Sequence, residues 1–398
     1  MTPRSDLLDA AASEMEAAVD LRRRLHRRPE LGLDLPWAQE TVLAELDGLD
    51  LDLRTGTSVS SVVAVLDGDQ PGPTVLLRAD MDALPMPEDT DLEFRSEVDG
   101  AMHACGHDAH VAMLVGAARL LHARRGLLHG RVVFAFQPGE EGHHGARFMI
   151  EEGLLEGDTR PDSAFAIHIT PTIPNGMIAT RPGPFMASAD VVRITVTGRG
   201  GHASMPHQAL DPIPVACEIV QAIQSMITRR VDAFDPAVLT IAKIEAGTTN
   251  NVIPEAAHLT GTLRAVSART RQQVLDGLRR LAEGIADAHE ATATVTIDEG
   301  YPVTVNDAGM AATSARVATT VVGERAVIEL PSPVMGAEDF SYVLEEVPGA
   351  MVFLGAMPDG PRPPAPNHSN RMVLDESAMA AGIALHTAVA LDQLAPIG

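Results

Sequence analysis

The segment AMHACGHDAH, at residues 101–110, concentrates side chains that can do chemistry. Residues two apart do not share a helix face, but Gly106 allows a tight turn through which Cys105 and His107 can converge from a loop before a helix. A thiolate and an imidazole are suitable ligands for zinc-like divalent ions. From this segment alone two interpretations stand side by side: half of a metal site, or a buried cysteine beside polar residues that begin a helix.

A second segment, FAFQPGEEG at residues 134–142, places Glu140 and Glu141 shortly after an apolar strand. In open α/β sheets, ligands bind beyond the carboxyl ends of the strands. Neighbouring side chains point in different directions, so one glutamate can hold a metal while the other faces the substrate and moves a proton. A generic glutamate pair belongs to a charged surface loop, but the strand and the Pro-Gly turn before this pair favour the functional interpretation.

Three further groups could complete a metal site. His168 lies in the apolar run FAIHI, His368 lies in a Pro-rich loop, and two aspartates, Asp80 and Asp82, follow an apolar strand. Taken singly, His168 is most simply a core residue and His368 a surface residue. The two aspartates could bind metal directly or orient a metal-bound histidine. With the first two segments they supply enough ligands for two divalent ions and an adjacent base. Two ions roughly 3.5–4 Å apart share a water and lower its pKa towards ~7, and a glutamate then takes up the proton.

Two segments in the second half of the chain offer groups for a substrate. GRGGHASMPH is a Gly-rich turn that presents His202 and His207, and a histidine here can donate a hydrogen bond to a tetrahedral oxyanion. Asn251 and Arg264, in NNVIPEAAHLTGTLR, form a donor pair that fits a substrate carboxylate. Without that context, a surface salt bridge is the simpler interpretation of Arg264.

The elements that must position these groups indicate an α/β fold. Apolar strands alternate with helices in the first part of the chain, which predicts a mostly parallel central sheet flanked by helices. The strands are expected at 61–67, 74–80, 130–137 and 162–169. A long amphipathic helix is expected at 108–125, with Asp108 as its N-cap.

The pattern changes near residue 185. The run DVVRITVTG alternates polar and apolar residues, as a half-exposed antiparallel strand does, and further strands and amphipathic helices follow. These elements predict a compact α+β domain at 185–295, inserted into a catalytic domain formed by 1–184 and 296–398. After the insert, ATVTIDEG and AMVFLGA are expected to resume the buried strands of the larger domain.

Composition narrows the class of protein. The 398 residues include 30 Lys and Arg against 54 Asp and Glu, a formal net charge of −24 that disfavours nucleic acid and anionic membranes as partners. Two cysteines do not suggest a disulfide framework. Neither a secretory signal nor an uncharged membrane span is visible. The sequence therefore predicts a soluble, cytoplasmic protein of about two domains.

Six motifs occur in order across nearly the whole chain: RADMDALP, MHACGHDAH, QPGEEG, GRGGHAS, NVIPEAAHLTGTLR and MGAEDFSYV. In this combination the sequence resembles the aminoacylase-like two-metal metallopeptidase family. Within that family it resembles the amidohydrolase branch of hippurate hydrolases, N-acyl-amino-acid amidohydrolases and auxin-conjugate hydrolases. The resemblance implies a catalytic domain with a central sheet and an inserted lid domain that often mediates homodimer formation.

The resemblance also implies roles for individual residues. The metal ligands would be Cys105, His107, Glu141, His168 and His368. The thiolate of Cys105 would bridge the two ions, Glu140 would be the general base and acid, and Asp82 would orient the site. In the inserted domain, His202 would assist the oxyanion, and the substrate carboxylate would be bound by Asn251 and Arg264.

Some positions depart from the family pattern or stay without a role. Asn370 stands where the family usually has proline, and the segment 168–170 lacks the bulky residue expected after the strand histidine. These changes flank ligands without replacing them, so they concern the shape of the pocket and the substrate. No role follows for Asp80, Glu338 or Asp339, although the last two fall in a family motif.

The expected activity is the metal-dependent cleavage of the amide bond in an N-acyl amino acid, which releases a carboxylic acid and a free amino acid. A dipeptidase or an N-acetyl-diaminopimelate-type deacetylase would use the same core. A metal-dependent ligand-binding protein without catalysis is a third hypothesis. Manganese, zinc, cobalt and nickel all remain open, because a thiolate suits softer ions while carboxylates tolerate manganese.

Overall fold

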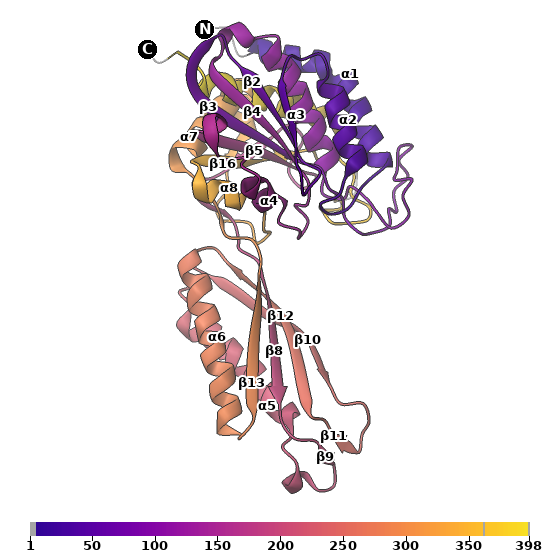
Figure 1. The fold of residues 1–398 in the computed structure, drawn as a ribbon, viewed down its shortest axis with the longest axis vertical. Coiled ribbons are helices and arrows are strands. Elements are labelled where there is room, and N and C mark those ends of the chain that lie inside the picture. The colour runs from indigo at the N-terminus through magenta and orange to yellow at the C-terminus, as the bar shows by residue number, and fades with distance from the viewer. Residues whose placement is uncertain (1–4, 361–362, 397–398) are drawn as a thin grey trace. The chain divides into compact units, whose positions relative to one another are not determined.

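The computed structural model describes residues 5–360 and 363–396, and the chain divides into two compact units (Figure 1). The larger unit comprises Met1–Phe185, Val305–Ser332 and Asp339–Gly398, and the smaller unit comprises Met186–Thr304 and Pro333–Glu338. The smaller unit is therefore inserted into the chain of the larger one. Within the described residues, no helix combines the length and apolar character that crossing a bilayer requires.

An eight-stranded sheet forms the centre of the larger unit, in the order β1-β2-β4-β3-β5-β16-β6-β15. The four central strands, β4, β3, β5 and β16, are parallel to one another. This sheet confirms the predicted α/β class. Its strands are β1 (Asp52–Thr55), β2 (Val62–Asp67), β3 (Gln70–Asp80), β4 (His129–Gln137), β5 (Ser163–Thr170), β6 (Ile178–Thr180), β15 (Val327–Glu329) and β16 (Gly349–Gly355).

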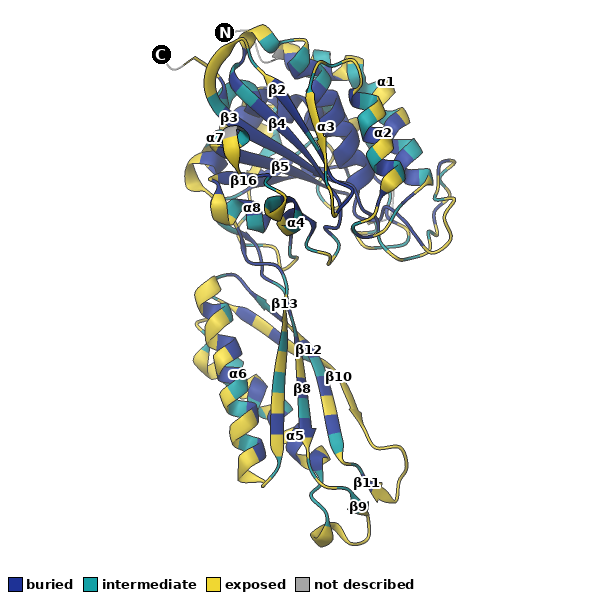
Figure 2. Ribbon diagram, in the orientation of Figure 1, coloured by how far each residue is buried: buried dark blue, intermediate teal, exposed yellow. Residues whose placement is uncertain are grey.

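Helices cover this sheet, and the packing buries its central strands (Figure 2). Every residue of β5 and β16 is buried, as expected for parallel strands with both faces covered. The helices α1, α3 and α9 pack against one another and α7 packs against α9. The helices are α1 (Ser5–Arg27), α2 (Pro36–Leu46), α3 (His107–His122), α4 (Gly145–Glu151), α7 (Ala308–Val322), α8 (Ser341–Glu346) and α9 (Met379–Gln393).

The start of α3 differs from the sequence prediction. The helix begins at His107, directly after Gly106, whose φ of +86° lies in the left-handed region that glycine adopts easily. Asp108 is thus the second residue of the helix and not its N-cap. Its buried carboxylate pairs instead with Arg22 and His26 of α1, at 3.2 and 2.8 Å. The N-cap prediction is wrong because the true partners of this side chain come from a distant helix.

The smaller unit is a four-stranded antiparallel sheet in the order β10-β12-β8-β13 with two helices. Burial alternates along β8 and β12, because one face of the sheet packs on the helices. The elements are β8 (Asp190–Thr197), α5 (Pro212–Arg230), β10 (Ala237–Ala246), β12 (Ala256–Ala265), α6 (Ala268–Ala288) and β13 (Thr292–Glu299). Two short strands, β9 (Gly201–His202) and β11 (Val252–Ile253), pair with each other.

The strand β13 corrects one detail of the expected organisation. The run ATVTIDEG was expected to resume the central sheet, but β13 pairs with β8 and forms an edge of the smaller sheet. Its residues are mostly exposed or half-buried, in keeping with an edge strand. The run AMVFLGA does return to the central sheet, as β16. The connecting strands β7 (Gly183–Met186) and β14 (Thr304–Asn306) lie where the chain leaves and re-enters the larger unit.

Candidate metal centre

The carboxyl ends of three parallel strands carry the chemistry of the larger unit. Asp80 is the last residue of β3, and the glutamate pair follows β4. His168 lies two residues before Thr170, the last residue of β5. Because the strands are parallel, these ends meet at one edge of the sheet. The first turn of α3 and the loop around His368 reach the same edge.

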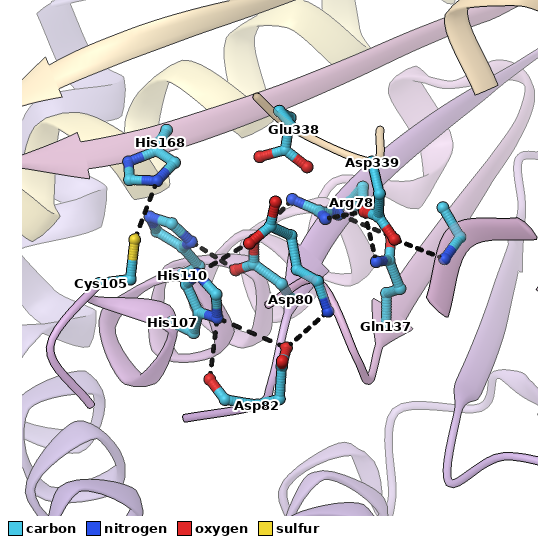
Figure 3. A network of polar contacts seen from close by, with 12 residues as sticks. Arg78, Asp80, Asp82, Cys105, His107, His110, Gln137, His168, Glu338 and Asp339 are labelled. Atoms are coloured by element: carbon cyan, nitrogen blue, oxygen red, sulfur yellow. Dashed lines mark hydrogen bonds and ion pairs between the residues drawn. The ribbon is translucent and has the colours of Figure 1, made fainter. Parts of the chain in front are cut away.

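The first group of candidate ligands is Cys105, His107 and His168. Their ligand atoms all lie within 4.8 Å of one another, and all three residues are buried. The Sγ of Cys105 lies 3.4 Å from Nε2 of His168 (Figure 3). Between Cys105 and His107 the chain makes the left-handed turn at Gly106, and the two side chains meet in this group.

The second group is Cys105, Glu141 and His368, with ligand atoms again within 4.8 Å of one another. Nε2 of His368 lies 3.3 Å from Oε1 of Glu141, and Nε2 of His107 lies 4.0 Å from the same oxygen. His368 has a φ of +65°, unusual for a residue with a side chain, and its side chain is 56% exposed. Cys105 belongs to both groups, so its sulfur lies between them.

Hydrogen bonds set the tautomers of the two buried histidines. Nδ1 of His107 lies 2.8 Å from the carbonyl oxygen of Asp82, and Nδ1 of His168 lies 2.8 Å from the carbonyl oxygen of Ile169. A carbonyl can only accept, so each Nδ1 carries a proton, and in the neutral ring each Nε2 keeps its lone pair. Both lone pairs face the cluster, which is the arrangement of metal-binding histidines.

Two buried atoms of the cluster have no hydrogen-bond partner among the described residues: Nε2 of His107 and Oε1 of Glu141. Buried polar atoms are nearly always satisfied, and exceptions call for a cause. These two atoms are 4.0 Å apart and both present lone pairs. A cation between them would satisfy both at once, so the donor set fits a divalent metal ion.

The pKa values of the clustered side chains also favour a bound cation. Burial would lower the pKa of His107, but the Asp80 carboxylate, Asp82 and Cys105 together outweigh burial and hold it well above its usual range. Interactions with Cys105 first, and then with Glu141, raise the pKa of His368 to about 10. Burial, and then the charge of Glu141, raises the pKa of the Cys105 thiol. The acidic cluster therefore attracts positive charge, and a bound cation would favour the thiolate instead.

Asp82 fixes the turn that carries the glutamates. Its Oδ1 accepts a hydrogen bond from the backbone N–H of Glu140 and its Oδ2 accepts one from Glu141, each at 2.9 Å. Its carbonyl also orients His107. One aspartate thus positions candidate site residues from two segments. The carboxylate of Glu140 is 6% exposed and belongs to a third group with His107 and Glu141.

A buried ion network that the sequence did not reveal lies beside the cluster (Figure 3). Arg78 contacts Asp80 at 2.6 Å and Asp339 at 3.0 Å, and Gln137 bonds to both Arg78 and Asp339. His110 bonds to Asp80 at 2.5 Å. The sequence did single out Asp80 and Asp339 without a role, and a further signal is a charged residue, Arg78, inside the apolar run TVLLRAD.

The remaining predicted site residues belong to the smaller unit. Pairing of β9 with β11 brings His202 and Asn251 together, because the N–H of Ala203 donates to the Asn251 carbonyl at 3.1 Å. Arg264 lies on β12, separately from that pair, and burial lowers its pKa against the opposing effect of Asp190. The structure thus groups two of these three residues.

Comparison with known proteins places the chain in a family. The family model described as peptidase family M20/M25/M40 matches residues 76–392. The chain is 39% identical over 377 residues to thermostable carboxypeptidase 2 of Saccharolobus solfataricus, which covers 94% of each chain. It is 40% identical over 345 residues to N-acetylcysteine deacetylase of Bacillus subtilis, which covers 85% of this chain and 87% of the relative.

A solved structure supports the same family assignment. A Bacillus subtilis protein described as a dinuclear metal-binding peptidase of the M20 family superposes with a TM-score of 0.84 at 32% identity, covering 96% of this chain and 99% of that one. The match of sequence and of fold extends over both units, which confirms the resemblance seen in the motifs. The chain belongs to peptidase family M20/M25/M40 and is a hydrolase of that family.

Proposed function

We propose that this hydrolase is a metal-dependent amidohydrolase that cleaves the amide bond of N-acyl amino acids into a carboxylic acid and a free amino acid. The observation that carries the proposal is the unsatisfied pair formed by Nε2 of His107 and Oε1 of Glu141, inside two interlocking ligand groups. A neighbouring buried carboxylate, Glu140, is available for proton transfer.

In this proposal two divalent ions would be held by Cys105, His107, Glu141, His168 and His368. Bound ions of this kind would supply Lewis-acid chemistry, because they polarise a carbonyl group and lower the pKa of water. The mixed sulfur, nitrogen and oxygen donors are compatible with manganese, zinc, cobalt or nickel. Cys105 belongs to both candidate ligand groups, so its side chain could contribute to either.

The chain's own residues then handle the substrate and the proton. Glu140 takes the proton of the attacking water and delivers it to the amine nitrogen as the amide bond breaks. Asp82 keeps Glu140 and Glu141 in place through their backbone N–H groups. Arg264 and Asn251 bind the substrate carboxylate in this proposal, and His202 stabilises the developing oxyanion. These roles follow from the family motifs in which the three residues lie.

Relatives support an acyl amino acid over other amides. One is named for the deacetylation of N-acetylcysteine, which is itself an N-acyl amino acid. Another is named a carboxypeptidase, so a dipeptidase or a deacetylase of a biosynthetic intermediate is the alternative. A binding protein without catalysis fits less well, because the catalytic positions are all present.

Homodimer formation through the smaller unit and a cytoplasmic location complete the proposal.

The test is amino acid release from a panel of N-acetyl, N-benzoyl and indole-acetyl amino acids and dipeptides. Protein stripped with a chelator should be silent and should recover on reloading with manganese. Glu140→Gln should lower turnover by about 10²–10⁴-fold while it keeps its metal content. Glu141→Gln should lose metal as well as activity. Glu16→Gln, a change at an exposed position of α1, is the matched control.

A fully active Glu140→Gln variant would refute the assigned proton transfer. Metal uptake by the wild-type protein with no release from any panel member would refute the proposed substrate class. Preference for dipeptides over acyl amino acids would establish the alternative.

A further inference from the structure

The imidazole of His110 has both ring nitrogens engaged, although it lies beside the candidate ligands. Its Nδ1 lies 2.5 Å from Oδ1 of Asp80, and its Nε2 accepts the backbone N–H of Ile169 at 2.8 Å. The ring is 1% exposed and stacks on His107 with centroids 5.4 Å apart. Neither nitrogen is left for a metal ion, so the residue needs another explanation.

We propose that His110 is a positioning residue: it holds the backbone of Ile169 at the N–H, and the carbonyl of Ile169 in turn aims the imidazole of His168 at Cys105. The inference rests on the proposed function, in which His168 is a metal ligand. The geometry is a chain of three bonds, from Asp80 to His110, from His110 to the Ile169 N–H, and from the Ile169 carbonyl to Nδ1 of His168.

The backbone at Ile169 needs this support because it lies beyond the sheet pairing on one side. β5 pairs with β3 only as far as Ala166, opposite Arg78, whereas its pairing with β16 continues to Thr170. The side chain of His110 supplies an acceptor where β3 has ended. The orientation of the peptide that joins His168 to Ile169 would otherwise depend on one neighbouring strand.

The carbonyl of Ile169, which belongs to the next peptide unit, is held as well. It accepts from Nδ1 of His168 at 2.8 Å and from Nδ2 of Asn367 at 3.3 Å, and Asn367 also donates to the carbonyl of Cys105 at 3.1 Å. The backbone of this one residue therefore ties together the strand histidine, the loop that carries Cys105, and the residue that precedes His368.

Asp80 and Asp339 gain a role in this arrangement. Asp80 is fully buried, and its Oδ2 pairs with Arg78 while its Oδ1 receives the Nδ1–H of His110. Arg78 is in turn held by Asp339 and Gln137. Because these side chains are 2% exposed or less, each has few alternative partners. The network is a rigid base for His110.

The test is cobalt(II) binding to chelator-stripped protein, followed by absorption in the visible and the thiolate-to-metal charge-transfer regions. His110→Ala should weaken cobalt binding by about 10–100-fold, the usual effect of losing a residue that orients a metal ligand. It should also change the spectrum. His110→Gln offers an amide oxygen to the Ile169 N–H and should restore most of the affinity. The matched control is His122→Ala, a histidine at the other end of α3.

The outcomes separate the two proposals. Wild-type protein that takes up no cobalt would overturn the proposed function and this inference with it. Normal cobalt binding by the wild type and equal binding by folded His110→Ala, with an unchanged spectrum, would overturn only the role of His110. If His110→Gln fails as badly as His110→Ala, the route through the Ile169 N–H is wrong. Should the alanine variant not fold, the glutamine variant decides alone: cobalt affinity within a few-fold of wild type supports the route.

Discussion

Replacing Gly106 by alanine should destabilise the larger unit by roughly 2–5 kcal/mol in the absence of metal. Two independent costs add. A side chain at a φ of +86° costs ~1–2 kcal/mol. The new methyl would also lie 2.5 Å from Cγ2 of Ile169 and 3.1 Å from Cδ1 of Leu374, and forcing atoms into a packed site costs ~1–3 kcal/mol.

A second glycine separates these costs. Gly100 has a φ of +75°, but no atom lies within 4 Å of the position its Cβ would take. Gly100→Ala should therefore show the backbone cost alone. The assay is urea unfolding of chelator-stripped protein, followed by the fluorescence of Trp37, the single tryptophan of the chain, which lies in α2 of the larger unit.

Metal binding provides a second test of Gly106→Ala. Because Ile169 follows His168, a displaced Ile169 should weaken metal binding in Gly106→Ala and leave it unchanged in Gly100→Ala. Equal unfolding free energies for the two variants would refute the steric part of the argument. Unchanged metal affinity in Gly106→Ala would show that the turn does not set the positions of the ligands.

Three more predictions concern the surroundings of the site. Asp108→Asn should lower the free energy of unfolding in urea by about 3 kcal/mol, the low end for a broken buried ion pair. The loss is at the low end because Glu376 still lies 2.9 Å from Nη1 of Arg22, the partner of Asp108. A loss below experimental error would refute a stabilising role for the pair. Burial raises the pKa of Glu88, but hydrogen bonds, first among them that with His26, lower it to about 2 from its ordinary 4.5. Its contribution to stability is thus complete above pH 4.5 and lost as the pH falls towards 2, and Glu88→Gln should flatten the stability curve in that window. Saturating manganese at 100 times its dissociation constant should raise the unfolding free energy by about 2.7 kcal/mol per site, which thermal unfolding with and without chelator would detect.

Features coded in short segments could be predicted from the sequence. The Cys-Gly-His spacing predicts a turn with converging ligands, and Gly106 adopts the required left-handed conformation. Likewise, the glutamate pair follows β4 as its apolar run indicates. The class of the sheet follows from uninterrupted apolar strands, because only strands covered on both faces have that pattern.

Features that depend on distant partners could not be predicted. The Asp108 carboxylate has the right type for an N-cap, and only the fold shows that Arg22 and His26 take it. The role of Asp339 depends on Arg78, 261 positions away in the chain. The strand β13 has a pattern that fits either sheet, and its partner β8 decides the matter.

The insertion of the smaller unit affects how the chain is made. β5 ends at Thr170 and its parallel neighbour β16 begins at Gly349, about 180 positions later. At about 5–20 residues per second, a ribosome needs roughly 10 to 40 s to cover that interval. During this time β5, whose residues are all buried in the finished protein, has an unpaired edge. We expect nascent chains to need protection from aggregation over this interval, while the smaller unit is already able to fold.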